Sequence, residues 1–297
     1  MMSRRVESAI DALDKLTDEQ KWERLTKLGA QVEKSADAEK PILMMARAVK
    51  DDLGDRLPSA IARSLYRPVR RYLWRRHRDQ RKEIPRYPLP TSALLDAIVS
   101  LARAERDVKG VQALVNYNFD DLLDEKLREQ HVKCRTVLSG RDSVPPGALP
   151  CYHVHGLISS REYIRNRVGV KAKGNFVFSE DEYHAEYSDP YKWSNMTQMS
   201  LLGRHTGLFL GLSMEDPNIR RLIDVTHHQY PDNLNYAILP RKRPLRGVRD
   251  NSESVLKNLF EEVETKSFEK IGVRVIWIDD YSEAPSLIHQ ICGGDSA

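Results

Sequence analysis

The sequence predicts an α/β fold, in which a Rossmann-like, mostly parallel sheet with helices on both faces follows a helical N-terminal portion. Residues 6–81 carry apolar side chains at three- and four-residue spacing without period-two alternation, which is typical of amphipathic helices. From residue 91 onward, short apolar runs alternate with amphipathic stretches, as in a parallel sheet covered by helices. The proline-bearing segment 85–90 separates the two patterns. We therefore divide the chain into a helical portion, residues 1–90, and a Rossmann-like core, residues 91–297.

Each expected element has a local signal. In the helical portion, Thr17 is placed to cap a helix containing Trp22, and residues 55–58 form a turn before a helix that includes Ile61. In the core, a helix over residues 91–103 leads to the first strand. The expected strands are 111–115, 152–155, 175–178, 207–211, 236–239 and 273–278. The expected helices between them include 121–129, 216–229 and 252–266.

Composition narrows the class of protein. Apolar residues make up 40% of the 297 residues and charged residues 30%, which suits a chain that buries a core rather than a disordered one. The formal charge of +4 is too small to call for nucleic acid by itself. Three scattered cysteines, Cys134, Cys151 and Cys292, predict neither a disulfide framework nor a zinc ribbon. The absence of a signal peptide or of an apolar run of about 18 residues predicts a cytoplasmic protein outside the membrane.

Three segments lie where strands are expected to run into helices, which is where open parallel sheets bind their ligands. The first is 116–123, Asn-Tyr-Asn-Phe-Asp-Asp-Leu-Leu. Here the expected strand gives way to a helix within about three residues, so amide and carboxylate side chains meet free backbone N–H groups. Two interpretations remain open. Asn118 and Asp120 contact a ligand, or they cap the helix.

The second segment is 151–156, Cys-Tyr-His-Val-His-Gly. If it is a strand, Cys151, His153 and His155 point to one face. The histidines then belong to a metal site, or one of them acts as a general base, or both are hydrogen-bonded residues at a strand end. No fourth metal ligand is evident in the sequence, so we expect no metal. Gly156 allows close approach of a backbone or ligand.

The third segment is 208–220, in which an apolar strand ends in Gly211-Leu212-Ser213 and a helix follows. Asp216 and Pro217 suit the N-cap and the first helical position. The turn around Gly211 and Ser213 is able to accept a ribose or a phosphate on its backbone, although it needs only to be a tight turn. For Asp216 we expect a cap rather than a catalyst.

Four motifs stand in a fixed order along the chain: residues 116–123, His155-Gly156, residues 178–183 (Phe-Ser-Glu-Asp-Glu-Tyr), and Phe209-x-Gly-x-Ser-x-x-Asp-Pro-x-x-Arg220. In this order they resemble the sirtuin-like NAD-hydrolase domains of prokaryotic antiphage defence proteins. The resemblance runs through most of residues 40–290. The family's corresponding signatures are Thr-Thr-Asn-Tyr-Asp, His-Gly, Leu-Thr-x-x-Asp-Tyr and Phe-x-Gly-x-Ser-x-x-Asp-Pro-x-x-Arg.

The resemblance implies that NAD binds here and that its nicotinamide–ribose bond is cleaved. It implies Asn118 and His155 as the catalytic pair, Asp120 as the residue that holds the nicotinamide carboxamide, and Gly211 and Ser213 as the ribose-contacting turn. Such a reaction passes through an oxocarbenium-like ribose, as glycoside hydrolysis does. A neutral His155 suits the deprotonation of a water or a ribose hydroxyl.

Two features depart from the family. The family begins with a central strand and a Gly-Ala-Gly-x-Ser turn that holds the pyrophosphate, yet residues 1–21 contain no glycine, although Trp22-Glu23-Arg24-Leu25 resembles the helix that follows that turn. Either the turn precedes the sequence as written, which we favour, or the protein has given up NAD. Slow or absent NAD hydrolysis is expected from the sequence as written. The second departure is the absence of zinc-binding cysteines, which makes protein deacylation the lesser enzymatic alternative.

A basic stretch with two aromatic residues lies in the helical portion; its members are Arg67, Arg70, Arg71, Tyr72, Trp74, Arg75, Arg76, Arg78, Arg81 and Lys82. It serves as a solvated helix face, as a protein interface or as a nucleic-acid contact. The family commonly forms multimers, so we expect a homo-oligomer, with a second defence-system protein as a further partner.

The sequence thus predicts a NAD glycohydrolase that releases nicotinamide and ADP-ribose in antiphage, abortive-infection-type defence. The alternative from another class is a catalytically inactive module that binds nucleotide or a partner protein.

Overall fold

The computed structural model describes residues 39–66, 91–103, 110–166, 169–241 and 261–292. The chain divides into two compact units. The first comprises residues 1–54 together with 178–183, and the second comprises residues 55–177 and 184–297. The predicted cap at Thr17, the helix at Trp22 and the basic stretch 67–82 lie outside the described residues. The predicted boundary near residue 90 stays a prediction.

The first unit contains helix α3 (Glu39–Leu53) and the segment 178–183. Two ion pairs join them. Lys50 pairs with Glu182, and Arg47 lies 3.1 Å from Asp181. Glu182 also accepts the backbone N–H of Ser179. The 178–183 motif is therefore held to α3 through its acidic side chains.

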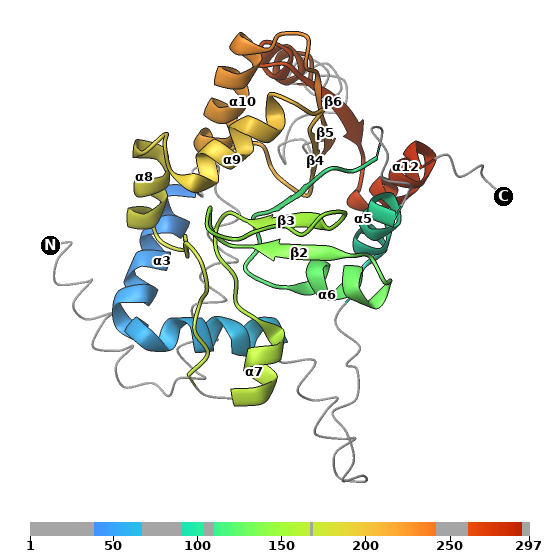
Figure 1. The fold of residues 1–297 in the computed structure, drawn as a ribbon. Helices are drawn as coiled ribbons and strands as arrows, with labels where there is room; N and C mark the ends of the chain where they lie inside the picture. Colours follow the sequence, from blue (N-terminus) through green and yellow to red (C-terminus); the bar gives the residue numbers. More distant parts are fainter. Residues whose placement is uncertain (1–38, 67–90, 104–109, 167–168, 242–260, 293–297) are drawn as a thin grey trace, which may run out of the picture. The chain divides into compact units, whose positions relative to one another are not determined.

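The second unit holds two parallel, three-stranded sheets (Figure 1). In the first, β3 (Leu149–His153) lies between β1 (Leu114–Asn116) and β2 (Cys134–Val137). In the second, β5 lies between β4 and β6; these strands are Leu208–Leu210 (β4), Asn235–Pro240 (β5) and Val273–Ile278 (β6). Parallel pairing brings the carboxyl ends of each sheet's strands to one edge.

Further helices flank these strands along the chain. They are α5 (Ala93–Arg103), α6 (Leu122–Glu129), α7 (Ser160–Asn166), α8 (Glu180–Ser188), α9 (Trp193–Leu202), α10 (Pro217–Gln229) and α12 (Ala284–Ile291), with 3-10 turns at Gly54–Arg56 (η1) and Tyr281–Glu283 (η2). Residues 57–66 and 261–269 are also helical.

The first sheet is covered on both faces because its central strand alternates. Leu149 of β3 joins Val99 of α5 and Leu127 of α6 in one buried cluster. Tyr152, three residues further along β3, points to the opposite face, where its ring centroid lies 6.4 Å from that of Trp193 of α9. Successive strand residues point to opposite faces, so one strand serves two helical layers.

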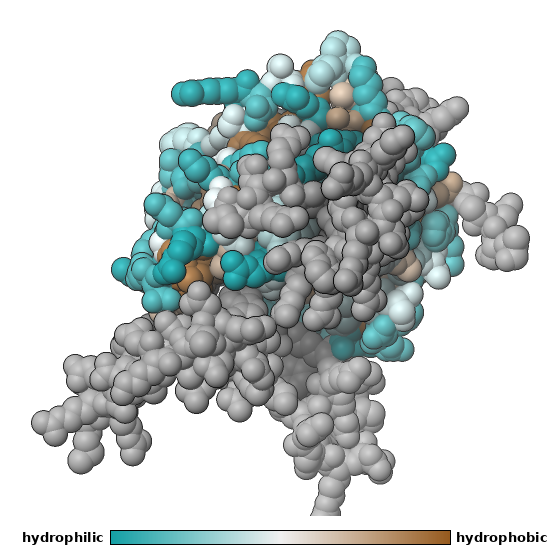
Figure 2. Space-filling view, turned by 90° about the horizontal axis from the view of Figure 1, so that it is seen from below, coloured by the Kyte–Doolittle hydropathy of each residue, from teal (hydrophilic) through white to brown (hydrophobic). Residues whose placement is uncertain are grey.

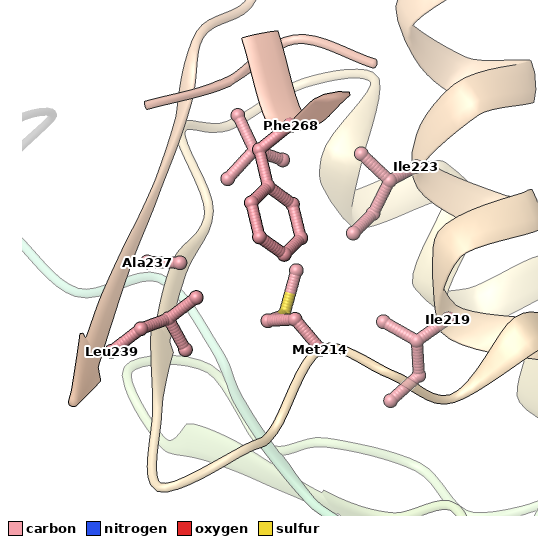
Figure 3. Close-up of a cluster of buried hydrophobic side chains, with 7 residues drawn as sticks. Met214, Ile219, Ile223, Ala237, Leu239 and Phe268 are labelled. Atoms are coloured by element: carbon pink, nitrogen blue, oxygen red, sulfur yellow. The ribbon is translucent and has the colours of Figure 1, made fainter. Parts of the chain in front are cut away.

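The second sheet has the same arrangement. Ile238 and Ile278 pack with Ala284 of α12 on one face, and Leu94 of α5 adjoins them; α5 and α12 lie side by side in Figure 1. On the other face, β5 and β6 meet α10 and the helix over residues 261–269. Figure 3 shows that core, in which the side chain of Met214 lies between Phe268, Ile219 and Leu239.

The α/β class with parallel sheets and flanking helices is confirmed, but several elements differ from the prediction. The predicted strand 175–178 is wrong: the segment is irregular, and the nearby pairing is a single bridge between Leu157 and Lys173. Val177 is buried there although the segment forms no strand. Strand β2 and helices α7 to α9 were not predicted, because their polar residues gave no clear period.

Among the residues coloured by hydropathy on the face shown in Figure 2, hydrophilic ones predominate and the hydrophobic areas among them are small. Every helix in the described ranges is too short or too polar to cross a lipid bilayer.

Replacing Ile223 by alanine tests the core in Figure 3. Its side chain is wholly buried, so Ile223→Ala is expected to lower the free energy of unfolding by about 2–5 kcal/mol. Val225 on the same helix is 41% exposed, and Val225→Ala is expected to change it by less than about 0.5 kcal/mol. Urea unfolding of both variants measures the difference; equal losses would contradict the assigned core.

Candidate functional site

The predicted site begins where two neighbouring strands end. Asn116 of β1 is paired with His153 of β3, and the backbone N–H of Val154 donates to the Asn116 carbonyl at 3.3 Å. After each of these two strands, the backbone turns away from the sheet. Asn118 and His155 each lie two residues beyond this last pair. The register of the sheet therefore brings the two predicted catalytic residues to the same edge.

The turn after β1 is held by its own side chains. The backbone N–H of Asn118 donates to Oδ1 of Asn116 at 2.9 Å, while Asn118 itself is exposed. Oδ1 of Asp120 accepts the N–H of Leu122, the first residue of α6, at 3.1 Å. Burial raises the pKa of Asp120, and that hydrogen bond opposes the shift. Asp120 thus supports the start of the helix, while Asn118 faces solvent.

Asp121 also holds this turn in place through its side chain. Its carboxylate is buried and accepts the N–H of Ser160 at 2.9 Å. The hydroxyl of Tyr66 donates to the carbonyl of Ile158 at 2.7 Å and lies 3.2 Å from Oδ1 of Asp121. These contacts tie the first turn of α6 to the chain that follows His155.

A buried polar cluster joins α6 to β3. Nε2 of His153 lies 2.8 Å from Oδ2 of Asp124, and both side chains are wholly buried. The thiol of Cys151 reaches the same carboxylate oxygen at 3.4 Å, and Thr136 donates to the other oxygen. Burial alone raises the pKa of Asp124, but the hydrogen bond and charge of His153 outweigh it and lower the pKa.

Asp124, Cys151 and His153 form the one group in the described part of the chain with the donor types and spacing to hold a metal ion. The sequence did not reveal Asp124 as a member. Their polar atoms bond to one another, which favours the interpretation of hydrogen-bonded residues for His153. Cys151 and His153 share a face of β3, as predicted.

His155, in contrast, lies in the turn after β3 and not on the strand, which corrects the prediction of a shared face with His153. Its carbonyl accepts the N–H of Val177 at 3.1 Å. Gly156 follows with φ +87°, and a Cβ there would lie 2.9 Å from the Cα of Phe176. Glycine is required both by the left-handed backbone and by the close approach of the neighbouring loop.

The imidazole of His155 is partly enclosed. The ring of Tyr117 meets it edge to face, with centroids 5.2 Å apart. Burial lowers the pKa of His155, and the negative charges of Asp216 and Glu186 oppose that shift. The net lowering leaves the imidazole neutral near pH 7, as a general base requires.

The third predicted segment turns sharply after β4. Gly211 has φ +68° with open space around its Cα, so the backbone conformation rather than crowding requires a glycine. Ser213 is exposed, and its hydroxyl accepts the N–H of Glu215 at 3.3 Å. Asp216 caps α10 by accepting the N–H groups of Asn218 and Ile219, which confirms the predicted cap.

Tyr117, in the first segment, joins that segment to the other two. Its ring packs against the core cluster that contains Met214, and the charge of Asp216 acts on both Tyr117 and His155. The Asn turn, the His-Gly turn and the Gly-x-Ser segment are therefore neighbours. Together they bring an exposed amide, an imidazole whose pKa is lowered and a left-handed glycine turn, a combination that suits binding and deprotonation of a hydroxylated ligand.

Sequence reasoning missed the buried polar residues of α8 and α9. Glu186 is 1% exposed and accepts from Lys192 at 2.8 Å, from Asn175 and from Ser194. Gln198 accepts the hydroxyl of Tyr117. In the sequence these residues resemble a solvated helix face, so no local signal sets them apart.

Comparison with known proteins adds one match. A family model described as a SIR2-like domain matches residues 112–271, which contain all three segments. No curated protein matches the chain.

Removal of the Asp124 carboxylate is expected to destabilise the fold. Asp124→Asn leaves His153 in a dry site without its charged partner, which costs about 3–5 kcal/mol. Because the folded-state pKa of Asp124 is lowered, its contribution is present above the unfolded value of about 3.9 and is lost as pH falls through the folded pKa. Urea unfolding at pH 7 and at pH 3 measures both effects. Glu129→Gln, an exposed change on the same helix, is the control; equal loss in both variants contradicts the prediction.

The two turn glycines are expected to differ. Gly211→Ala introduces only left-handed backbone strain, about 1–2 kcal/mol. Gly156→Ala adds a collision with backbone atoms at 2.9–3.0 Å, which brings the total to about 3 kcal/mol or more. Thermal unfolding ranks the two variants, and the assignment of the 156 turn is wrong if Gly156→Ala is the milder.

Proposed function

Because the chain belongs to the SIR2-like domain family, we propose that it is a NAD glycohydrolase that cleaves the nicotinamide–ribose bond and releases nicotinamide and ADP-ribose. SIR2-like domains use NAD. The observation that carries the proposal is the placement of the half-buried His155, whose pKa burial lowers, beside the turn of Asn118 on the edge where two parallel strands end.

His155 takes the part of the general base. Water attacks C1′ of the ribose, the C1′–N bond breaks, and its electron pair neutralises the pyridinium nitrogen of the leaving nicotinamide. The proton of the attacking water passes to the imidazole of His155. Because burial lowers the pKa of His155, its imidazole is in the neutral form that can accept a proton. Asn118, exposed on the neighbouring turn, orients the water or a ribose hydroxyl through its amide.

Asp120 and the Gly211–Ser213 segment take the binding roles. Oδ1 of Asp120 is held by the N–H of Leu122, so its carboxyl group is fixed in orientation for the nicotinamide carboxamide. The left-handed turn at Gly211 presents backbone groups at the surface next to Ser213, where a ribose hydroxyl is able to bind. No step of this reaction requires a metal.

We place the reaction in antiphage, abortive-infection-type defence, with a second copy of the chain or another defence protein as partner. Support for this placement comes from the order of the four motifs, 116–123, 155–156, 178–183 and 209–220.

Incubation with NAD, followed by chromatography of the products, tests the proposal. The wild-type chain is expected to release nicotinamide and ADP-ribose slowly, since residues 1–21 lack glycine for a phosphate-binding turn. His155→Ala and Asn118→Ala are expected to lower the rate by about 100-fold or more, to background, because each removes a reacting-centre contact. His228→Ala, at an exposed histidine of α10, serves as the matched control and keeps the wild-type rate.

Equal background from all four proteins favours the inactive module over the proposal. Thermal shift with NAD then separates its two forms: a NAD-dependent rise in melting temperature indicates a nucleotide-binding module, and no rise indicates a partner-binding one. Release of nicotinamide that His155→Ala leaves unchanged assigns the chemistry to other residues.

A further inference from the structure

Tyr117 belongs to the first segment of the site and lies next to the other two, but it has no role in the chemistry described above. Its ring meets the imidazole of His155 at 80° with centroids 5.2 Å apart. The same ring packs on the core cluster that includes Met214. An edge-to-face ring contact prefers a fixed geometry, and it removes water from the imidazole surface that it covers.

The phenol end of Tyr117 is fixed from a second direction. Its hydroxyl donates to Oε1 of Gln198, a buried residue of α9. Nε2 of Gln198 in turn donates to the carbonyl of Ser194 at 3.1 Å, so the amide presents its oxygen to Tyr117. Rotation of the ring away from His155 breaks this hydrogen bond inside the protein, which is costly.

We propose that Tyr117 is the positioning residue of His155: its ring, locked by Gln198, holds the imidazole in one orientation and shields it from water. His155 as a base rests on the proposed function, whereas the contact and the shielding do not. The ring excludes water from the imidazole, and removal of the ring admits it.

The charges around His155 fix the direction of the effect. Asp216 at the start of α10 and Glu186 of α8, the latter paired with Lys192, both raise the pKa of His155, while burial lowers it more strongly. Loss of the Tyr117 ring weakens the burial and leaves both carboxylates in place. The pKa of His155 therefore moves upward, and the fraction of neutral imidazole near pH 6 falls.

Titration of the histidines by NMR tests this without NAD. The protein carries nine histidines, and the signal of His155 is the one absent from His155→Ala. In the wild-type protein its midpoint is expected below the ordinary value of about 6.5. In Tyr117→Ala the midpoint moves upward, and in Gln198→Ala it moves upward by less, because the ring stays but is no longer locked. Tyr191→Ala, at a residue 81% exposed, is the matched control and leaves it unchanged.

A midpoint that both Tyr117→Ala and Gln198→Ala leave at the wild-type value, in folded protein by near-ultraviolet circular dichroism, overturns the proposal. Should Tyr117→Ala fail to fold, Gln198→Ala alone decides. If nicotinamide release is also measurable, Tyr117→Ala shifts the acid limb of its pH profile upward in step with the midpoint. If the midpoints shift as expected but the protein never cleaves NAD, the proposed function is contradicted and the positioning role of Tyr117 is supported.

Discussion

The contact between Asp124 and His153 decides how the two halves of the site meet. Asn118 and Asp120 precede α6, and His155 follows β3, so their separation depends on how that helix seats on that strand. A 2.8 Å hydrogen bond between two wholly buried side chains fixes this seating, with Thr136 and Cys151 on the same carboxylate. In a dry interior such a pair has no water to replace a lost partner. The position of the proposed catalytic pair thus depends on a contact in the core.

Further contacts fix the turns of the proposed site relative to the core. Asp121 binds the N–H of Ser160, which ties the start of α6 to the chain beyond His155. Tyr117 then bridges from this turn to α9 through Gln198 and to the core beside the Gly211 segment. The strand ends at Asn116 and His153 thus position the turns that carry Asn118 and His155, the residues proposed to react. Such preorganisation is what bond cleavage by positioning and proton transfer demands.

Much of the architecture could be predicted from periodicity, since five of the expected strands overlap observed ones, with shifted ends, and the cap at Asp216 is confirmed. The strand at 175–178 failed because apolar residues of a buried loop look like a strand. Helices α8 and α9 escaped prediction because their polar residues Glu186, Ser194 and Gln198 are buried, and Gln198 accepts a hydrogen bond from Tyr117 in the turn after β1. Local sequence carries no record of such partners, which come from distant positions.

The sequence by itself determined the α/β class, the order of the motifs and the residue types at the site. These depend on local sequence pattern and on turns whose left-handed backbone requires glycine. Tertiary structure alone decided which of two histidines faces the site: His153 is taken into the core by Asp124, and His155 is left in the turn beyond it. It also decided that Tyr117 meets His155, and it set the direction of the shift in the pKa of that imidazole. Burial and charge at one point depend on segments distant in the chain, and only folding brings them together.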